Sequence, residues 1–223
     1  MNSKKINMKF FKISICVIAI FFSSAIFAGN EDRAGSAGAT DLLVNPWARS
    51  SAWGSAGISS VNGLEGIFLN VAGLAYAEQT EIQFARTNWM GNISGIGLNA
   101  AGFAQRVGEA GVLGVSFVSM NYGDIEITTT ELPEGGIGYF NPSSINLTLS
   151  YAKKFSSSIS GGMNLKIVSQ SISNVGAQGV AIDAGIRYVT GEQDNIKFAI
   201  SLKNVGPPMS FSGDGLSLDI LNP

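Results

Sequence analysis

Two neighbouring runs of alternating side chains, within residues 143–170, constrain the fold more than any other feature of the sequence. The first run places Ile145, Leu147, Leu149 and Tyr151 between polar residues. After a break at residues 156–158 the alternation resumes, with apolar and polar residues as follows: Ile159, Met163, Leu165 and Ile167, against Ser160, Asn164, Lys166 and Gln170. A period of two predicts extended strands, because successive side chains leave a strand on opposite faces. Two such runs joined by a few small polar residues predict a β-hairpin.

The polar face of this hairpin is mostly uncharged, and each strand has about ten residues or more. These proportions suit a transmembrane β-barrel, whose outer face contacts lipid and whose inner face is wet or plugged. A soluble β-sandwich shows the same alternation, so the hairpin by itself leaves both architectures open.

The same alternation predicts seven strands in total and no long helix after residue 80. The predicted strands are 81–90, 93–105, 111–129, 143–155, 159–171, 179–190 and 195–203. Their apolar sides, which we expect to face outward, include Ile82, Phe84, Ile96, Leu98, Leu113, Val115, Phe117, Ile182, Ile186, Tyr188, Ile196, Phe198, Ile200 and Leu202. The fold class is therefore predicted to be all-β, with an antiparallel sheet.

The lengths of the links between these strands favour the barrel. Short links at 106–110, 156–158 and 191–194 alternate with longer ones at 130–142 and 172–178; the tight turn at 91–92 breaks the rule. Bacterial barrels have short turns on the periplasmic side and longer loops outside. A soluble sandwich has no reason to sort its links in this way.

The amino-acid composition argues against several classes of function. The chain has 223 residues, of which 13% are charged, against roughly 25% in an ordinary soluble domain. The net charge of −2 argues against nucleic-acid binding, since there is no excess of basic residues to neutralise phosphates. The sequence contains no His and a single Cys, Cys16. The usual ligands of transition metals and the usual nucleophile–base pairs are thus missing, and we expect a protein that is not an enzyme and needs no cofactor or metal.

Residues 1–28 have the pattern of a secretory signal peptide. Four lysines precede an apolar stretch at residues 13–22, and small residues then offer cleavage after Ala28 or after Ala25. An uncleaved anchor is the alternative. An exported chain without a later apolar helix spans a membrane as a barrel or not at all. The signal peptide and the strands together predict that the mature chain resides in the outer membrane of a Gram-negative-type bacterium.

Residues 29–80 form a second region, in which the strand alternation is absent. It contains, in a fixed order, Gly35-Ser-Ala-Gly-Ala39, Leu42-Leu43-Val44, Ala48-Arg49-Ser50, Trp53-Gly54-Ser55-Ala56 and Leu69-Asn70-Val71-Ala72-Gly73-Leu74-Ala75. These segments resemble the PorV/PorQ family of outer-membrane proteins, which is itself similar to the FadL-like barrels. Val71 stands where that family has Pro, and Trp53 where it usually has Met. The resemblance continues through Ser150–Phe155, Gly161–Lys166, Ile182–Ile186 and Ser201–Gly206.

The resemblance implies a FadL-like antiparallel transmembrane barrel, with residues 29–80 as a lead-in and plug and residues 81–223 as wall strands. A segment lying on the surface is the alternative for the plug. Seven strands is an odd number, whereas bacterial single-chain barrels have an even number, so we expect an incomplete barrel of seven or eight strands here and further strands after residue 223.

The resemblance also implies a role in the type IX secretion system. Members of the family carry secreted cargo that bears a C-terminal signal domain, or anchor a surface partner. The expected partners are therefore secretion-system components, secreted cargo proteins and the lipid bilayer of the outer membrane. A FadL-like transporter of hydrophobic small molecules is the alternative.

Two groups of residues are candidates for functional contacts. The first group consists of charged residues on the polar sides of their strands, which we expect to face the lumen: Arg86, Lys166, Asp183 and Arg187. They are solvated or mutually paired charges, or alternatively contacts for the plug or for a passing ligand. Tyr139 and Phe140 lie in the glycine-rich link 130–142 and are the candidate partner-binding residues, because an adaptable loop with aromatic anchors is typical of a binding surface. Three glutamates near this link, Glu126, Glu131 and Glu134, match no calcium-binding spacing.

Overall fold

The computed structural model describes residues 36–37, 39–91, 95–109 and 111–216. The chain divides into two units, residues 1–35 and 36–223, and only the second contains described residues. The predicted signal peptide, both of its cleavage positions and the first part of the lead-in lie outside the described residues. No helix in the described part of the chain has the length and apolar character needed to cross a membrane.

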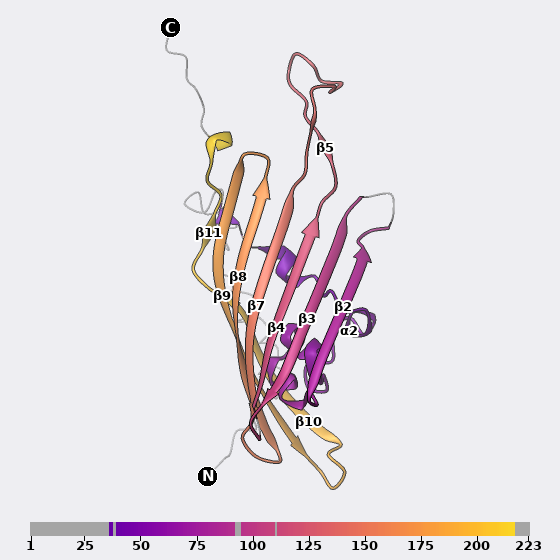
Figure 1. Cartoon of the computed structure of the whole chain (residues 1–223), viewed down its shortest axis with the longest axis vertical. Coiled ribbons are helices and arrows are strands. Elements are labelled where there is room, and N and C mark those ends of the chain that lie inside the picture. Colours follow the sequence, from indigo (N-terminus) through magenta and orange to yellow (C-terminus); the bar gives the residue numbers. More distant parts are fainter. Residues whose placement is uncertain (1–35, 38, 92–94, 110, 217–223) are drawn as a thin grey trace, which may run out of the picture. The chain divides into compact units, whose positions relative to one another are not determined.

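A seven-stranded antiparallel sheet dominates the second unit (Figure 1). Its strand order is β10-β9-β8-β7-β4-β3-β2, so each strand pairs with the strands of this sheet that come before and after it in the sequence. The strands are β2 (Thr80–Asn88), β3 (Gly97–Val107), β4 (Gly111–Asn121), β7 (Ser143–Lys154), β8 (Ile159–Ile172), β9 (Val175–Thr190) and β10 (Ile196–Val205). The prediction of an all-β chain with seven long antiparallel strands is confirmed. β2 and β10 form the two edges and do not pair with each other.

The links between the strands differ from the prediction at one end of the sheet. The expected long link at 172–178 is wrong, because β8 and β9 pair as far as Ile172 and Val175 and leave a turn of two residues, Ser173 and Asn174. Ser173 has φ of 52°, the left-handed conformation that such tight hairpin turns require. Glycines and small polar residues at 171–179 hide the alternation there, so the sequence resembles a loop.

The predicted strand 111–129 is also too long. β4 ends at Asn121, and the chain then leaves the sheet until β7 begins. Within this excursion β5 (Ile125–Glu126) pairs with β6 (Tyr139–Phe140) in a two-stranded ladder of its own. Residues 122–142 therefore form a hairpin beyond the end of the sheet, which is visible above β4 and β7 in Figure 1.

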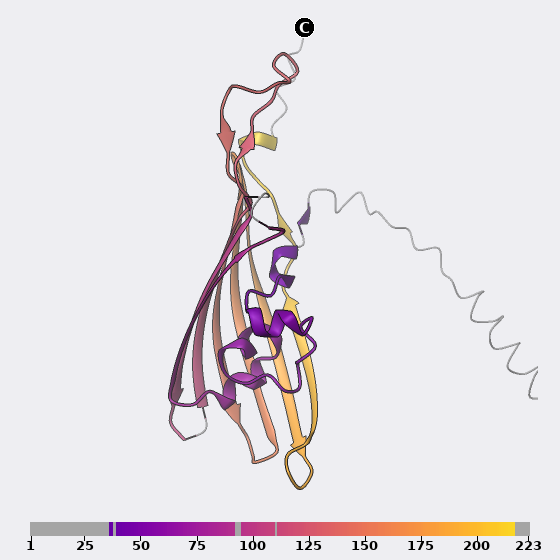
Figure 2. The same ribbon diagram turned by 90° about the vertical axis from the view of Figure 1, so that its right-hand side faces the viewer.

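The inner segment, residues 40–77, covers one face of the sheet (Figure 2). All of its residues are described and it contains no strand, in agreement with the absence of strand alternation in its sequence. Its elements are short helices: η2 (Thr40–Leu43), α2 (Ala48–Ala52), η3 (Gly63–Glu65), α3 (Gly66–Leu69) and η4 (Val71–Tyr76). Leu64, Ile67, Val71 and Leu74 of this segment form the main apolar core with small residues of the strands, namely Ala104, Val112 and Ala152. The sheet face that lies against the inner segment is called the covered face below.

Asn70 fixes a turn at the start of η4. Its side-chain oxygen accepts a hydrogen bond from Ala72 N at 3.0 Å and so caps η4. Its amide nitrogen donates to Ile58 O at 3.1 Å and to Ile186 O of β9 at 3.4 Å. The side chain thus fixes the turn and joins it to the sheet with Val71 in place of Pro.

The opposite side of the sheet, called the apolar face below, carries large apolar side chains with high exposure. It includes Ile82, Phe84, Phe103, Leu113, Val115, Phe117, Leu147, Leu149, Met163, Leu165, Ile167, Ile182, Ile186, Phe198, Ile200 and Leu202. The outward assignments made from the sequence are thus confirmed in β2, β4, β9 and β10. They are wrong in β3, where Leu98 is buried on the covered face and Phe103 is exposed. Five of the eleven residues of β3 are glycine or alanine, so the apolar alternation there is weak.

A small second ladder involves the residues that flank the large sheet in the sequence. β1 (Ser36–Ala37) pairs with β11 (Met209–Ser210), and η5 (Asp214–Leu216) follows. Met209 packs with Leu42, Val168 and Ala177 in a second apolar cluster. Ser36 and Ala37, which belong to the predicted lead-in, form the strand β1.

Candidate functional site

Three parts of the described structure have the chemistry of a functional site. They are a buried polar network on the covered face, a cavity within the inner segment, and the hairpin 122–142.

The centre of the polar network is an ion pair between Lys166 of β8 and Asp183 of β9. Their Nζ and Oδ2 atoms lie 2.7 Å apart, and each side chain is only 3% exposed. Asp183 also accepts hydrogen bonds from Asn164 Nδ2 at 2.8 Å and from the backbone N–H of Asn204 at 2.7 Å. Both oxygens of the carboxylate therefore accept from donors, as a buried charge requires.

An irregularity in β10 makes this arrangement possible. The pairing with β9 shifts between Leu202 and Val205, which is a β-bulge, and Asn204 has φ of 56°. Asn tolerates this left-handed conformation better than most residues. The bulge aims the Asn204 N–H at Asp183, and the Asn204 side-chain oxygen accepts from Lys166 Nζ at 2.7 Å.

The network also joins the sheet to the inner segment. Asn164 Nδ2 donates to Ile67 O at 2.8 Å. Arg187 donates through one terminal nitrogen to Val61 O at 2.9 Å and to Asn62 Oδ1 at 2.7 Å, although it lies 126 residues from Val61. Its guanidinium also lies over the Tyr76 ring, 4.3 Å from the centroid, and Lys154 Nζ lies 4.1 Å from the same centroid. These contacts hold the inner segment against the sheet.

The predicted lumen charges thus divide into two groups. Lys166, Asp183 and Arg187 lie together on the covered face, where the first two are paired with each other. The placement of Arg86 is wrong, because it shares the exposed side of β2 with Ile82 and Phe84. Arg86 is two residues from Phe84, so the period of two itself places both on one face.

Asp41 makes a second attachment at the other end of the inner segment. It accepts hydrogen bonds from Ser144 Oγ of β7 and from Gln170 Nε2 of β8, the latter at 2.6 Å. Burial, and then the negative charge of Asp41, raise the pKa of Tyr122 above its ordinary value. Asp41 is thus a structural contact, and sequence reasoning did not single it out because its partners lie 103 and 129 residues away.

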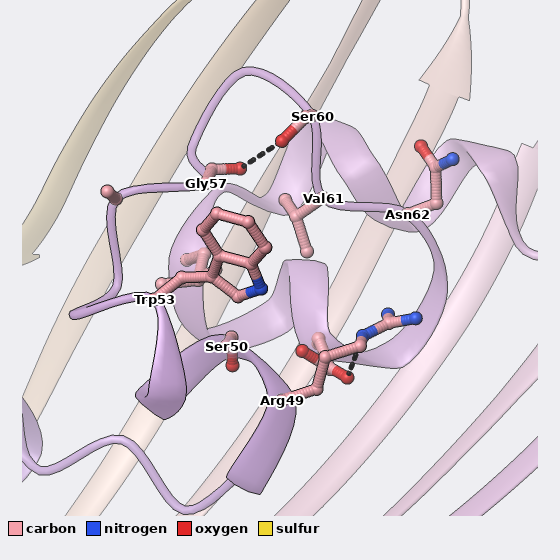
Figure 3. Close-up of a pocket in the computed structure, with 10 residues that line it drawn as sticks. Arg49, Ser50, Trp53, Gly57, Ser60, Val61 and Asn62 are labelled. Carbon is pink, nitrogen blue, oxygen red and sulfur yellow. Dashed lines mark hydrogen bonds and ion pairs between the residues drawn. The ribbon is translucent and has the colours of Figure 1, made fainter.

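The inner segment contains an open cavity of about 410 Å³, formed from its own residues (Figure 3). Arg49 and Trp53 lie at its rim, and Val61 and Leu69 supply apolar walls. Arg49 Nε contacts Glu65 Oε1 at 3.0 Å; the arginine side chain is 71% exposed and the glutamate side chain 5%. Trp53 is 75% exposed. The sequence signal for this site was weak, since these residues follow no periodic pattern.

The candidate binding residues Tyr139 and Phe140 both lie in β6 of the hairpin. The structure does not bring them to one surface, because consecutive residues of a strand face opposite sides. Tyr139 lies opposite Glu126 and is 67% exposed, whereas Phe140 lies opposite Ile125 and is partly buried. Ile125, Leu132 and Ile137 add further exposed apolar surface to the hairpin.

No group of three or more His, Cys, Asp or Glu side chains is placed to hold a metal ion in the part of the chain that the structure describes. The glutamates Glu126, Glu131 and Glu134 lie entirely within that part.

No protein-family model matches this chain, and a search of curated proteins finds no match. The similarity to the PorV/PorQ family therefore depends on the sequence segments quoted above.

Proposed function

We propose that this protein is an outer-membrane protein whose seven strands form part of a FadL-like transmembrane barrel, with the inner segment as its plug. The observation that carries the proposal is the contrast between the two faces of the sheet. The inner segment packs on the face that bears Lys166, Asp183 and Arg187, and no described element covers the apolar face. A soluble protein would bury its apolar face, whereas a lipid bilayer accepts it.

We further propose that the protein works by binding and not by catalysis, as a component of the type IX secretion system. In this role it captures secreted cargo that bears a C-terminal signal domain, or anchors a surface partner, as the PorV/PorQ resemblance implies. Two observations support a binding role. The plug is attached to the wall at Asp41, Asn164 and Arg187, and the hairpin 122–142 presents exposed apolar side chains beyond the sheet.

A FadL-like transporter of hydrophobic molecules is the second candidate. The cavity beside Trp53, with its apolar walls Val61 and Leu69, favours it. A transporter of this kind requires a path past the plug, and the buried hydrogen bonds of Arg187 and Asn164 oppose movement of the plug.

Capture by the full gene product, isolated in outer-membrane fractions, tests the role. The double variant Tyr139→Ala/Phe140→Ala is expected to lower retention of an added C-terminal signal domain by at least about tenfold, because aromatic anchors dominate binding energy. The matched control is Phe155→Ala, an equally exposed aromatic in the link 155–158 at the other end of the sheet. Retention unchanged in the double variant would contradict the role, as would recovery of the protein in the soluble periplasm. Loss of oleate uptake in Trp53→Ala would favour the transporter.

A further inference from the structure

One side of the hairpin 122–142 places an aromatic ring and a carboxylate opposite each other. Glu126 and Tyr139 are directly paired across the β5–β6 ladder, so their side chains leave the ribbon on the same side with Cβ atoms about 4.5–5.5 Å apart. Both are exposed. Phe140 is on the other side with Ile125, so the two candidate residues have different surroundings.

The Glu126 carboxylate is held in position by the hairpin itself. Its Oε1 accepts a hydrogen bond from Gly136 N at 2.9 Å. Gly136 has φ of 85°, a conformation that glycine adopts without strain, and this turns its N–H toward the glutamate. The second oxygen, Oε2, accepts no hydrogen bond from any described residue, and it remains available to a donor from outside.

The surroundings of this pair are uniformly acidic. Residues 122–142 contain Asp124, Glu126, Glu131 and Glu134 and no Lys or Arg. The two ion pairs found among the described residues, Arg49–Glu65 and Lys166–Asp183, both lie elsewhere. Asp124 accepts from Asn141 Nδ2 at 2.8 Å, a neutral donor that leaves its charge uncompensated. The negative field of the hairpin therefore attracts a cationic partner.

We propose that this hairpin recognises an arginine or lysine side chain of a partner protein, bound between the Tyr139 ring and Oε2 of Glu126. A cation over an aromatic ring is attracted by the negative face of the ring. A carboxylate beside it supplies a charge-assisted hydrogen bond. The other three carboxylates steer the partner during encounter. The proposal deepens the binding role above and rests on it, since it names the chemistry of the partner's contact surface.

The experiment uses the full chain in detergent micelles and two fluorescent probe peptides, one of alternating arginine and glycine and one with citrulline in place of each arginine. Citrulline has nearly the shape of arginine but no charge. Fluorescence polarisation at low salt is expected to show the arginine peptide binding about tenfold more tightly than the citrulline peptide. Raising the salt to 0.5 M is expected to remove most of that difference.

Single substitutions distinguish binding at the Glu126–Tyr139 pair from a general attraction by the negative charge of the hairpin. Glu126→Gln is expected to lose about tenfold in affinity for the arginine peptide, and Glu131→Gln about twofold, because only the first removes a contact. Tyr139→Leu is expected to lose several-fold, whereas Tyr139→Phe, which keeps the ring, is expected to bind as the wild type does. Glu192→Gln, in the link 191–195 at the other end of the sheet, is the control and is expected to have no effect.

Equal binding of the two peptides would overturn the proposal, and so would equal losses in Glu126→Gln and Glu131→Gln. The probe is not a cargo protein, so the result is separable from the capture experiment. Charge-dependent peptide binding without capture of the C-terminal signal domain would retain the cation site and reject the cargo role. Capture of the C-terminal signal domain that depends on Tyr139, with no preference for the arginine peptide, would retain the cargo role and reject the cation site.

Discussion

The two faces of β8 place neighbouring residues in opposite surroundings. Lys166 is buried beneath the inner segment and paired with Asp183, whereas Leu165, one residue earlier, is 46% exposed on the apolar face. In a water-soluble sheet the lysine would face solvent and the leucine the core. Polar contacts and an apolar core together hold the inner segment to the sheet. The exposure of the apolar face supports the proposal that it contacts lipid. Each face predicts a different consequence of mutation.

A substitution on the covered face is expected to cause the largest loss of stability. Asp183→Ala leaves Lys166 buried without its carboxylate and is expected to lower the free energy of unfolding by about 3–5 kcal/mol. Urea unfolding of the protein in detergent, followed by heat-modifiable gel mobility, measures this loss. Glu192→Ala, at an exposed position in a link, is expected to change stability by less than about 0.5 kcal/mol. A similar small change in Asp183→Ala would show that the ion pair does not hold the wall together.

A double substitution in the same network tests whether Lys166 and Asp183 stabilise the protein as a pair. Replacing both partners, Lys166→Met with Asp183→Leu, removes the uncompensated charge and is expected to recover part of the loss. The rest remains because Asn164 and the Asn204 N–H still lose their acceptor. The double-mutant cycle over the two positions gives their coupling energy. Additive losses would mean that the two side chains act independently.

A charged substitution on the apolar face is expected to cause the next largest loss of stability, and only when the protein is in a bilayer. Leu165→Arg is expected to destabilise the protein in lipid vesicles by about 2–4 kcal/mol if the residue lies near the midplane of the bilayer. Gln178→Arg on the same face, close to the end of β9, is the control and is expected to cost about 1 kcal/mol or less. If Leu165→Arg is harmless in vesicles, the apolar face does not contact lipid.

A substitution at a close contact between the inner segment and the sheet is expected to cause a smaller loss of stability. At Gly185 of β9 an added Cβ would overlap the side-chain oxygen of Asn70, so Gly185→Ala is expected to cost about 1–3 kcal/mol by overpacking. The control is Gly97→Ala in β3, where an added Cβ meets no atom within 4 Å. That change is expected to be neutral or slightly stabilising, because alanine loses less backbone freedom on folding. Urea midpoints of the two variants compare the sites directly.

The sequence by itself determined the existence and order of the seven strands and the outward side of most of them. Those properties depend on alternation between adjacent residues, and a period of two is visible wherever the two faces differ in polarity. The prediction from alternation was wrong in β3, where five of eleven residues are glycine or alanine and Leu98 was assigned to the wrong face. It also failed at 172–178, where small polar residues continue a hairpin up to a two-residue turn.

The tertiary structure decided which of these residues meet. Lys166 and Asp183 were each assigned to a polar side from the sequence, but their contact depends on the register of β8 with β9 and on the bulge at Asn204. The bond from Arg187 to Val61 joins residues 126 apart in the chain. No local pattern encodes such a contact, because it forms only when the inner segment packs on the sheet. The sequence assigned Tyr139 and Phe140 to a link, so their separation became evident only with the short strand β6. The pairing of Tyr139 with Glu126 likewise required the β5–β6 register.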